Sequence, residues 1–230
     1  LISRPLRIHA GQALELDRFA HIRLAPKSDC LMLENADQES GDANIAVRGG
    51  IWDMDNLRQT PNPLAVPTPA LKAQTTYVAS TYLGIGMRFV NVRGLTLQGL
   101  TFKDPVTFCV QLCRARDFTV DDVTFDFNMG NPIPGNMDGI HLDGGCRFGR
   151  ISNLKGTTYD DLVALIADDS FDAPLHGPLS DIEIDGIFAE GAHSAVRILS
   201  NHSPVERISI SNVHGTFYQY GIGITNIYSG

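Results

Sequence analysis

From Leu95 onward, five eight-residue segments repeat one pattern of apolar residues and turn-forming residues. They are LTLQGLTF from Leu95, FTVDDVTF from Phe118, GRISNLKG from Gly149, IEIDGIFA from Ile182 and ISISNVHG from Ile208. The third and sixth places are always apolar, and the fifth is always Gly, Asp or Asn. Short apolar alternations are typical of strands, and Gly, Asp and Asn accept left-handed backbone angles most readily. A regular internal repeat therefore constrains the fold before any single motif does.

A second strand-like run follows each of these segments. The runs are CVQL ending at Leu112, GIHL at Leu142, LVAL at Leu165, AVRI at Ile198 and GIGI at Ile224. The third place of the segment and the first apolar residue of the run are 12 or 13 residues apart in four repeats and 20 in the other. Fixed strands joined by corners of variable length are typical of a solenoid whose rungs stack in parallel. We therefore predict an all-β, right-handed parallel β-helix with Gly, Asp or Asn at its tight corners.

A closed barrel or a β-sandwich is the competing all-β interpretation. Those folds favour strands joined by two-residue hairpin turns such as Asn-Gly, and no such turn recurs along this chain. We expect a single domain over residues 1–230, interrupted by a long Pro-rich loop at about residues 57–76 that includes PNPLAVPTPALKAQ. Because ITNIYSG follows a strand directly, with no residues that could cap the stack, we also expect the chain to be part of a longer one.

Composition narrows the classes of partner. The formal net charge is −8 over 230 residues, and a nucleic-acid partner would require a basic stripe instead. No apolar run approaches the roughly 20 residues that span a bilayer, and no secretory leader is recognisable. The four cysteines match no zinc-binding spacing, so we predict buried thiols and leave a disulfide open; they are Cys30, Cys109, Cys113 and Cys146. We therefore expect the protein to bind neither a nucleic acid nor a membrane.

The repeat also predicts which polar side chains meet. Two places before the first apolar residue of successive second runs stand Asp138, Asp161, Ser194 and Tyr220. Equal places on successive rungs lie about 4.8 Å apart. Asp160 is adjacent to Asp161 in sequence, and His193 comes on the next rung. We therefore expect the three carboxylates and His193 to converge.

Two more candidates lie one place after the first apolar residue of their runs. They are His141 and Arg197, on the face that points away from the core. Strict alternation would place Asp160 and Asp161 on opposite faces, so both reach the patch only if the backbone bends at the strand entrance. Carboxylates this close cannot all ionise freely, and one is expected to keep a proton near neutral pH. A protonated acid beside ionised partners is the arrangement that glycoside hydrolysis requires.

Three motifs resemble those of the polygalacturonase family, glycoside hydrolase family 28. NMDGIHL, YDDLVAL and GAHSAVRI are similar to the family's Asn-Thr-Asp-Gly, Gly-Asp-Asp and Gly-His-Gly motifs on consecutive rungs. The stretch ANIAVRGGIWDMDN, residues 43 to 56, also resembles an early Gly-Gly-x-Trp-Asp rung of bacterial members. The resemblance implies a pectin-lyase-like solenoid that acts as an inverting hydrolase on a carbohydrate, without a cofactor or metal. It further implies an extracellular, cell-surface or periplasmic location.

The resemblance also implies a role for each matched residue. Asp160 would be the general acid, and Asp138 and Asp161 would hold and activate water. His193 would assist the acid or hold the substrate. The substrate-binding candidates are Asn136, His141 and Arg197.

The chain departs from the family where the family carries Arg-Ile-Lys, because Gly223 and Thr225 stand at the basic positions. Pectin and a glycan with a neutral sugar at the cleavage point are therefore both open as substrates. Two other functions are compatible with the same fold. Clustered carboxylates can hold Ca²⁺, which with Arg197 as the base would resemble a polysaccharide lyase. A non-catalytic β-helix of the tailspike or adhesin kind would bind a glycan without cleaving it.

Overall fold

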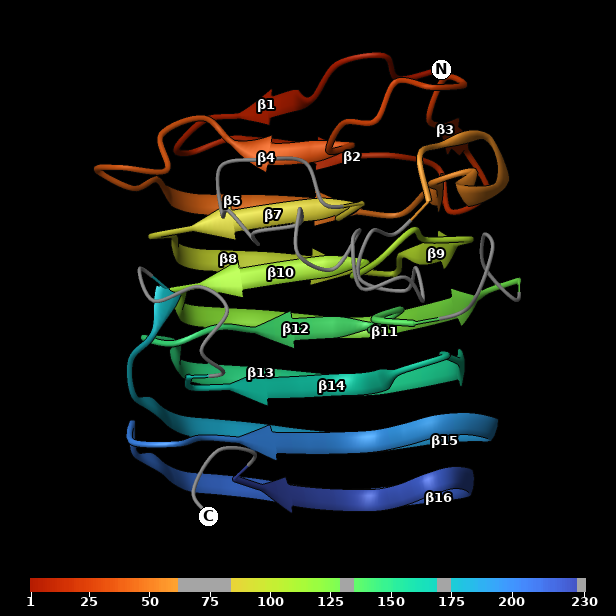
Figure 1. Cartoon of the computed structure of the whole chain (residues 1–230). Helices are drawn as coiled ribbons and strands as arrows, with labels where there is room; N and C mark the ends of the chain where they lie inside the picture. The colour runs from red at the N-terminus through yellow and green to blue at the C-terminus, as the bar shows by residue number, and fades with distance from the viewer. Residues whose placement is uncertain (62–83, 129–134, 169–174, 227–230) are drawn as a thin grey trace, which may run out of the picture.

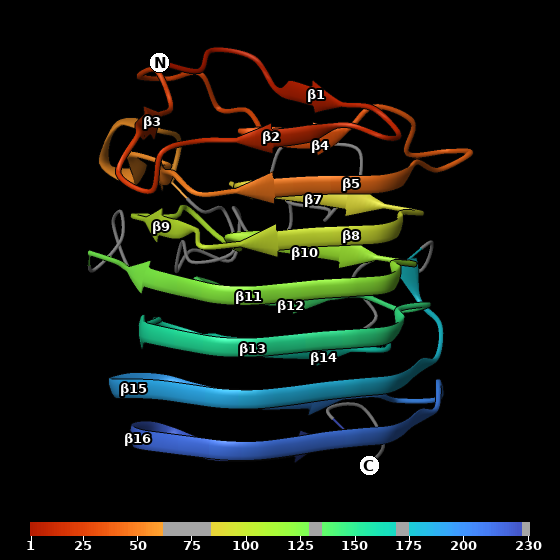
Figure 2. The same cartoon turned by 180° about the vertical axis from the view of Figure 1, so that it is seen from behind.

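The computed structural model describes residues 1–61, 84–128, 135–168 and 175–226. Within them the chain forms a parallel β-helix, and every strand pair is parallel. In Figure 1 the chain descends from the N-terminus to the C-terminus while the nearer strands run leftward and the farther strands rightward. Figure 2 shows the same sense from behind, so the coil is right-handed, as predicted.

The strands form three stacks. The front stack contains β1 (Leu6–Ile8), β4 (Leu33–Asn35), β7 (Met87–Val90), β10 (Val110–Cys113), β12 (Ile140–Leu142) and β14 (Asp161–Ile166). The back stack contains β2 (Ala13–Glu15), β5 (Ala43–Arg48), β8 (Arg93–Gln98), β11 (Arg116–Asp126) and β13 (Arg147–Thr157). The third contains β3 (His21–Arg23), β6 (Ile51–Asp53), β9 (Thr101–Lys103) and the end of β11, with a 3-10 turn η1 (Asn56–Arg58) after β6. The long strands β15 (Leu179–Leu199) and β16 (Val205–Thr225) each pass from the back stack into the front one.

The predicted register is confirmed in both stacks. In the back stack Val120 pairs with Leu97 on one side and with Ile151 on the other, and the column continues to Ile184 and Ile210. In the front stack the ends of the second runs align from Leu112 through Leu142 and Leu165 to Ile198 and Ile224. The repeat therefore lines up at the same places that the sequence indicates.

The corners take the conformation that the repeat predicts. All five residues at the fifth place have positive φ, between 51° and 81°; they are Gly99, Asp122, Asn153, Gly186 and Asn212. L-residues other than Gly, Asn and Asp adopt this region at a steric cost. The choice of residue at this place therefore fixes where each rung turns from the back stack toward the third.

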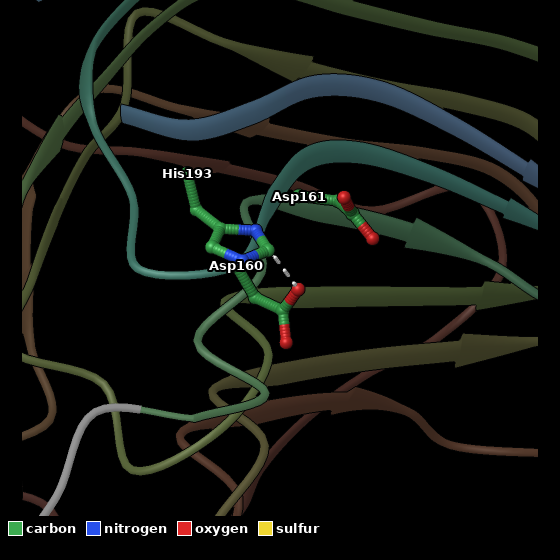
Figure 3. Close-up of side chains that lie close together, drawn as sticks. All are labelled: Asp160, Asp161 and His193. Carbon is green, nitrogen blue, oxygen red and sulfur yellow. Dashed lines mark ion pairs between the residues drawn. The ribbon is translucent and has the colours of Figure 1, made fainter. Parts of the chain in front are cut away.

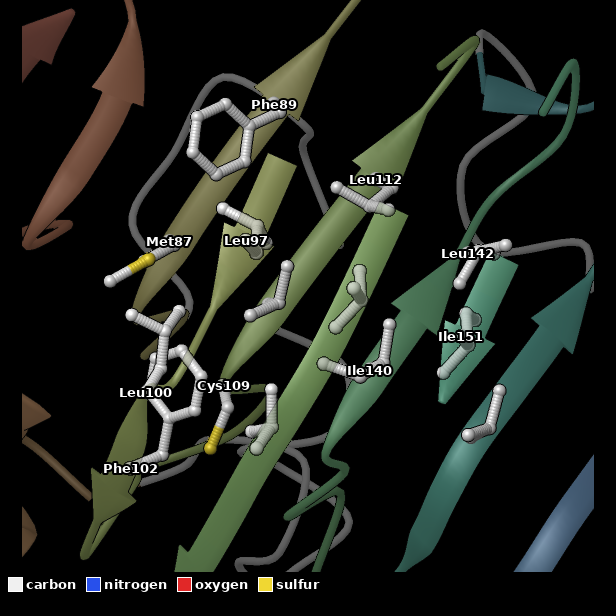
Figure 4. Packing of buried hydrophobic residues seen from close by; sticks show 14 of the residues in the cluster. Met87, Phe89, Leu97, Leu100, Phe102, Cys109, Leu112, Ile140, Leu142 and Ile151 are labelled. Atoms are coloured by element: carbon white, nitrogen blue, oxygen red, sulfur yellow. The ribbon is translucent and has the colours of Figure 1, made fainter. Parts of the chain in front are cut away.

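The stacked apolar columns form one continuous core between the sheets, part of which Figure 4 shows. Leu97, Ile140 and Ile151 are fully buried there, and the rings of Phe102 and Phe125 stack with centroids 6.3 Å apart. Trp52 is also fully buried, and its Nε1 donates a hydrogen bond to the Gly49 carbonyl at 3.1 Å. Apolar burial of this kind contributes about 25 cal/mol per Å² and is the main force that holds the rungs together.

Two further predictions concern the thiols and the loop. All four cysteines are free, and Cys109, Cys113 and Cys146 are buried, whereas Cys30 is half-buried. The predicted Pro-rich loop at residues 57–76 lies mostly outside the described residues, which resume at 84.

Candidate active site

The predicted column of polar residues exists at the entrance of the front strands. Asp161, the first residue of β14, pairs in register with Ser194, and Ser194 pairs with Tyr220. Asp138 lies one rung earlier, because the following residue, Gly139, donates its N–H to the Asp161 carbonyl at 2.9 Å. The carboxylates of Asp138 and Asp161 therefore come from neighbouring rungs of one sheet.

Asp160 and Asp161 both reach the same place, although they are adjacent in sequence. One oxygen of each carboxylate and one ring nitrogen of His193 lie within 4.8 Å of one another (Figure 3). Asp160 precedes the first residue of β14, and the Thr158 hydroxyl donates to its backbone carbonyl at 2.8 Å. Because Asp160 stands in this bend and not in the strand, the alternation of side chains does not apply to it.

The two carboxylates differ in exposure. The Asp160 side chain is 21% exposed, whereas that of Asp161 is 3% exposed. Asp160 can therefore touch a large ligand, and Asp161 can be reached only by something as small as water.

The surroundings of Asp160 favour its protonated form. Burial, together with the nearby charges of Asp138 and Asp161, raises the pKa of Asp160 to about 8. The backbone N–H of Asn136 donates to its Oδ2 at 3.0 Å, which opposes this rise without cancelling it. His193 Nδ1 lies 3.5 Å from Asp160 Oδ1, and burial lowers the pKa of His193, so its ring is neutral at pH 7. Asp160 is thus a carboxylic acid that keeps its proton at neutral pH.

Asp161 is held among donors. Burial first, and then the charge of Asp138, raises the pKa of Asp161 to about 7. The Tyr220 hydroxyl donates to its Oδ1 at 3.5 Å, and Arg197 Nη1 lies 3.9 Å from its Oδ2. Arg197 Nε also donates to the Thr225 hydroxyl at 3.4 Å. Asp161 is therefore fixed in position by the two following rungs.

The third carboxylate, Asp138, belongs to a buried row of charges. Its Oδ2 lies 2.7 Å from His141 Nδ1, and His141 Nε2 lies 3.5 Å from Asp143 Oδ1. Gln111 donates to the other oxygen of Asp143 at 2.7 Å, and Phe108 stacks on the imidazole with centroids 3.9 Å apart. Burial alone would lower the pKa of His141, but Asp143 and Asp138 outweigh it and raise that pKa to about 10. His141 is thus an imidazolium between two carboxylates.

The structure brings together Asp138, Asp160, Asp161 and His193, with Arg197 at the edge of the cluster. Two of the substrate-binding candidates lie differently from expectation. Asn136 reaches the site through its backbone N–H, at a positive φ of 53° that Asn tolerates.

His141 does point away from the core, but Phe108 and the two carboxylates cover it, and only 6% of the residue is exposed. The geometry therefore does not favour direct contact between this ring and a glycan. Two participants, Phe108 and Asp143, were absent from the prediction, and Tyr220 was placed in the predicted column without a role. Asp143 stands in the same HLDGG stretch as His141, which is the signal that could have identified it.

The cluster of Asp160, Asp161 and His193 is also the one group among the described residues whose donors are close enough to hold a metal ion together. Calcium prefers six to eight oxygen ligands. Here one of three donors is a neutral ring nitrogen, and Asp161 already faces Arg197. The donor set therefore fits Ca²⁺ poorly.

No protein-family model matches the chain, and no curated protein matches it in sequence. Solved structures do match in fold. The family 28 exopolygalacturonase of Yersinia enterocolitica aligns with a TM-score of 0.64 at 13% identity, over 98% of this chain and 53% of that one. A hyperthermoactive exopolygalacturonase from Thermotoga maritima aligns with a TM-score of 0.63 at 14% identity, over 96% of this chain and 65% of that one. A double mutant of the tailspike protein of E. coli bacteriophage HK620 aligns with a TM-score of 0.59 at 13% identity, over 98% of this chain and 41% of that one.

These likenesses establish a fold that two glycoside hydrolases and a phage tailspike share, and the chain spans 53% to 65% of the two enzymes. No helix among the described residues has the length and apolar character needed to cross a membrane.

Proposed function

We propose that this protein is a glycoside hydrolase that cleaves a polysaccharide or oligosaccharide with inversion at the anomeric carbon. One observation carries the proposal. Asp138, Asp160 and Asp161 converge at one point of the front sheet, and burial together with their mutual repulsion raises the pKa of Asp160 to about 8 and of Asp161 to about 7. The two polygalacturonases of the same fold make a glycan the substrate class to test first.

Asp160 acts as the general acid. Its pKa of about 8 keeps it protonated at pH 7, and its 21% exposed side chain can reach the oxygen of a glycosidic bond. It gives its proton to that oxygen as the bond to the anomeric carbon breaks. His193, 3.5 Å away and neutral, positions the acid.

Asp161 and Asp138 hold and deprotonate the attacking water. Oxygens of Asp160 and Asp161 lie within 4.8 Å, nearer to the roughly 5 Å of retaining enzymes than to the wider separation usual for inverting ones. Burial decides between these outcomes. A retaining nucleophile must bond to the anomeric carbon, but the side chains of Asp161 and Asp138 are only 3% and 6% exposed. A water molecule reaches them and a sugar carbon does not, so water is the nucleophile.

His141 holds the Asp138 carboxylate in position. The imidazolium lies 2.7 Å from the Asp138 carboxylate and is itself balanced by Asp143. We therefore assign His141 as a positioning residue for the base instead of a direct substrate contact.

The site favours a neutral sugar at the cleavage point. Arg197 borders the cluster, and its guanidinium already lies 3.9 Å from Asp161. Gly223 follows it in register on the next rung, and Thr225 accepts its hydrogen bond. The Arg197 guanidinium is therefore already engaged, and it is a poor partner for a uronate carboxylate. Because a polysaccharide cannot cross a membrane, we place the protein outside the cytoplasm, in the extracellular, cell-surface or periplasmic space.

The test is a product assay on a panel of neutral and acidic polysaccharides, with and without chelator. Hydrolysis releases reducing ends without the ultraviolet absorbance of an unsaturated sugar, and chelator leaves the rate unchanged. Proton NMR of the first product then reads the anomer, and inversion is expected. Asp126→Asn, an exposed carboxylate paired with Lys103 in the third stack, is the matched control for Asp160→Asn.

The other outcomes are equally specific. Ultraviolet absorbance that disappears in chelator would make the protein a lyase and overturn the acid–base assignment. Oligosaccharide binding without product would make it a glycan-binding β-helix and not an enzyme.

A further inference from the structure

A pocket of about 460 Å³ opens where β1, β4 and β7 meet, several rungs before the carboxylate cluster. This volume lies within the range of roughly 300–1,000 Å³ common for small-molecule sites. Its charged lining consists of Arg7, Asp29, Glu34 and Arg88, and Cys30 and Leu31 add a less polar wall. Arg7, Glu34 and Arg88 are register partners on three successive rungs.

Arg88 is the unusual member of this set. It stands between the fully buried Met87 and Phe89, and only 8% of the residue is exposed. Its Nε has no hydrogen-bond partner, and no ion pair reaches its guanidinium within the described part of the chain. A guanidinium stays charged at any ordinary pH, and burying a charge without a partner is strongly unfavourable. An arginine in this state is poised to receive an acceptor from outside the chain.

The other charges of the pocket already have partners. Arg7 Nε lies 2.9 Å from one oxygen of Glu34, and Gln38 donates to the other at 3.3 Å. Asp29 accepts hydrogen bonds from the backbone N–H and the hydroxyl of Thr60, both at 2.7 Å. Each carboxylate still has lone pairs to accept further hydrogen bonds. The pocket thus offers one unpaired fork of donors beside two carboxylates that can accept from hydroxyl groups.

We propose that this pocket binds a hydroxy acid, either free or as an acidic unit of a glycan, with its carboxylate on Arg88. The planar guanidinium matches a carboxylate with two parallel hydrogen bonds. Hydroxyl groups on the neighbouring carbons donate to Glu34 and Asp29, and the carbon face of the ligand packs on Leu31. The proposal is independent of the hydrolase assignment, because the pocket shares no residue with the carboxylate cluster.

The experiment is calorimetric titration of the Asp160→Asn protein, in which turnover is not expected, with glucuronate as the probe. Acetate supplies only the carboxylate and glucose only the hydroxyl groups, so each should bind at least about tenfold more weakly than glucuronate. Arg88→Gln should weaken glucuronate binding by about tenfold or more. The control is Arg48→Gln, which alters an exposed arginine paired with Glu15 in the back stack. An acidic oligosaccharide titrated in parallel separates a free acid from a glycan unit.

Three results would overturn the proposal. They are glucuronate binding that survives Arg88→Gln, acetate binding as tight as glucuronate binding, and no binding of either glucuronate or the acidic oligosaccharide. Thermal unfolding of Arg88→Met without ligand gives an independent check. Removing an unpaired buried charge should leave the Tm equal or higher, whereas a clear fall would mean that Arg88 serves the fold and not a ligand.

Discussion

At the scale of single residues, two adjacent aspartates have different roles because their exposures differ. Asp160 is 21% exposed and Asp161 is 3% exposed, which makes one the acid and the other a holder of water. Asp160→Asn should lower kcat by about 10²–10⁴, the usual contribution of general acid catalysis, with little change in KM. Steady-state kinetics on the best substrate of the panel measure this. If the variant keeps more than a tenth of the wild-type kcat, Asp160 is not the acid.

The pH profile gives a second prediction for the same residue. The acid must be protonated to act, and the pKa of Asp160 is about 8. We therefore expect kcat/KM to fall as pH rises through about 8, and not near pH 4 to 5 as an ordinary aspartic acid would require. A rate that is already lost at pH 6 would contradict the raised pKa.

Asp143 tests the buried row behind the base. His141 is charged because Asp143 and Asp138 both face it. Asp143→Asn removes one of these charges, so the pKa of His141 should fall below about 10. NMR titration of the ring proton reads this directly, with the exposed His9 as internal reference. Gln111→Ala provides the matched control, since it removes a hydrogen bond to Asp143 but no charge. An unchanged His141 titration in Asp143→Asn would rule out this electrostatic link.

Sequence reasoning reached the carboxylates but not the surroundings of His141. Asp138 and Asp161 are one repeat apart, so the repeat alone predicts their proximity. The burial of His141 depends on Phe108, which stands 33 residues earlier in the chain and reaches the imidazole only through the tertiary fold. No periodicity records that contact, and the repeat therefore could not show that this outward-facing histidine is covered.

At the scale of the rung, two of the corners have positive φ in every repeat, and the sequence revealed one of them. Gly, Asp or Asn marks the fifth place of each repeat, and all five residues there have positive φ. The residue just before the first place also has positive φ in every repeat, but there it is Gly94, Asp117, Phe148, Asp181 or Arg207. Phe and Arg rarely adopt this region, so the second corner carries no compositional signal.

Gly186 allows the corner rule to be tested without steric conflict. It has φ of 81°, and the nearest atom to a Cβ added there would be Oδ1 of Asn153, at 3.4 Å. Asn occupies the equivalent place on both neighbouring rungs, at Asn153 and Asn212. Gly186→Asn should therefore change the free energy of unfolding by less than about 1 kcal/mol, whereas Gly186→Val should lower it by about 1–2 kcal/mol or more. Chemical denaturation measures both. Equal losses in the two variants would mean that crowding, and not the backbone angle, limits this position.

At the scale of the molecule, the repeat predicted the fold because each rung contacts mainly its neighbours. A correct register for one pair of rungs, such as Val120 on Ile151, extends to the next by the same rule. The third stack was not foreseen. Its separate strands, β3, β6 and β9, are each only three residues long. An alternation of apolar and polar residues cannot be recognised in so short a strand.

The whole molecule should be most stable in mild acid, an unusual consequence of the site. The pKa values of Asp160 and Asp161 are about 8 and 7 in the folded protein, against an ordinary value of 3.8. Between about pH 4 and 8 the folded protein therefore binds protons that the unfolded chain has released, and stability falls as pH rises. His141 also makes the folded protein less stable as pH rises. Its pKa is about 10 instead of 6.5, so the stability that it contributes is complete below pH 6.5 and is lost as pH rises through about 10.

Asp168 opposes this trend only at lower pH. Backbone N–H groups of Asn201, His202 and Ser203 hold the pKa of Asp168 at about 2, so its contribution is present above about pH 4 and is lost as pH falls toward 2. Together these groups place the maximum of the Tm at about pH 4 to 5. Thermal unfolding between pH 3 and 9 measures it, and Asp160→Asn should flatten the decline from pH 4 to 8, whereas Asp126→Asn should not. A maximum at neutral pH, or parallel curves for wild type and Asp160→Asn, would show that the carboxylate cluster ionises like exposed acids, and the protonated general acid would then be untenable.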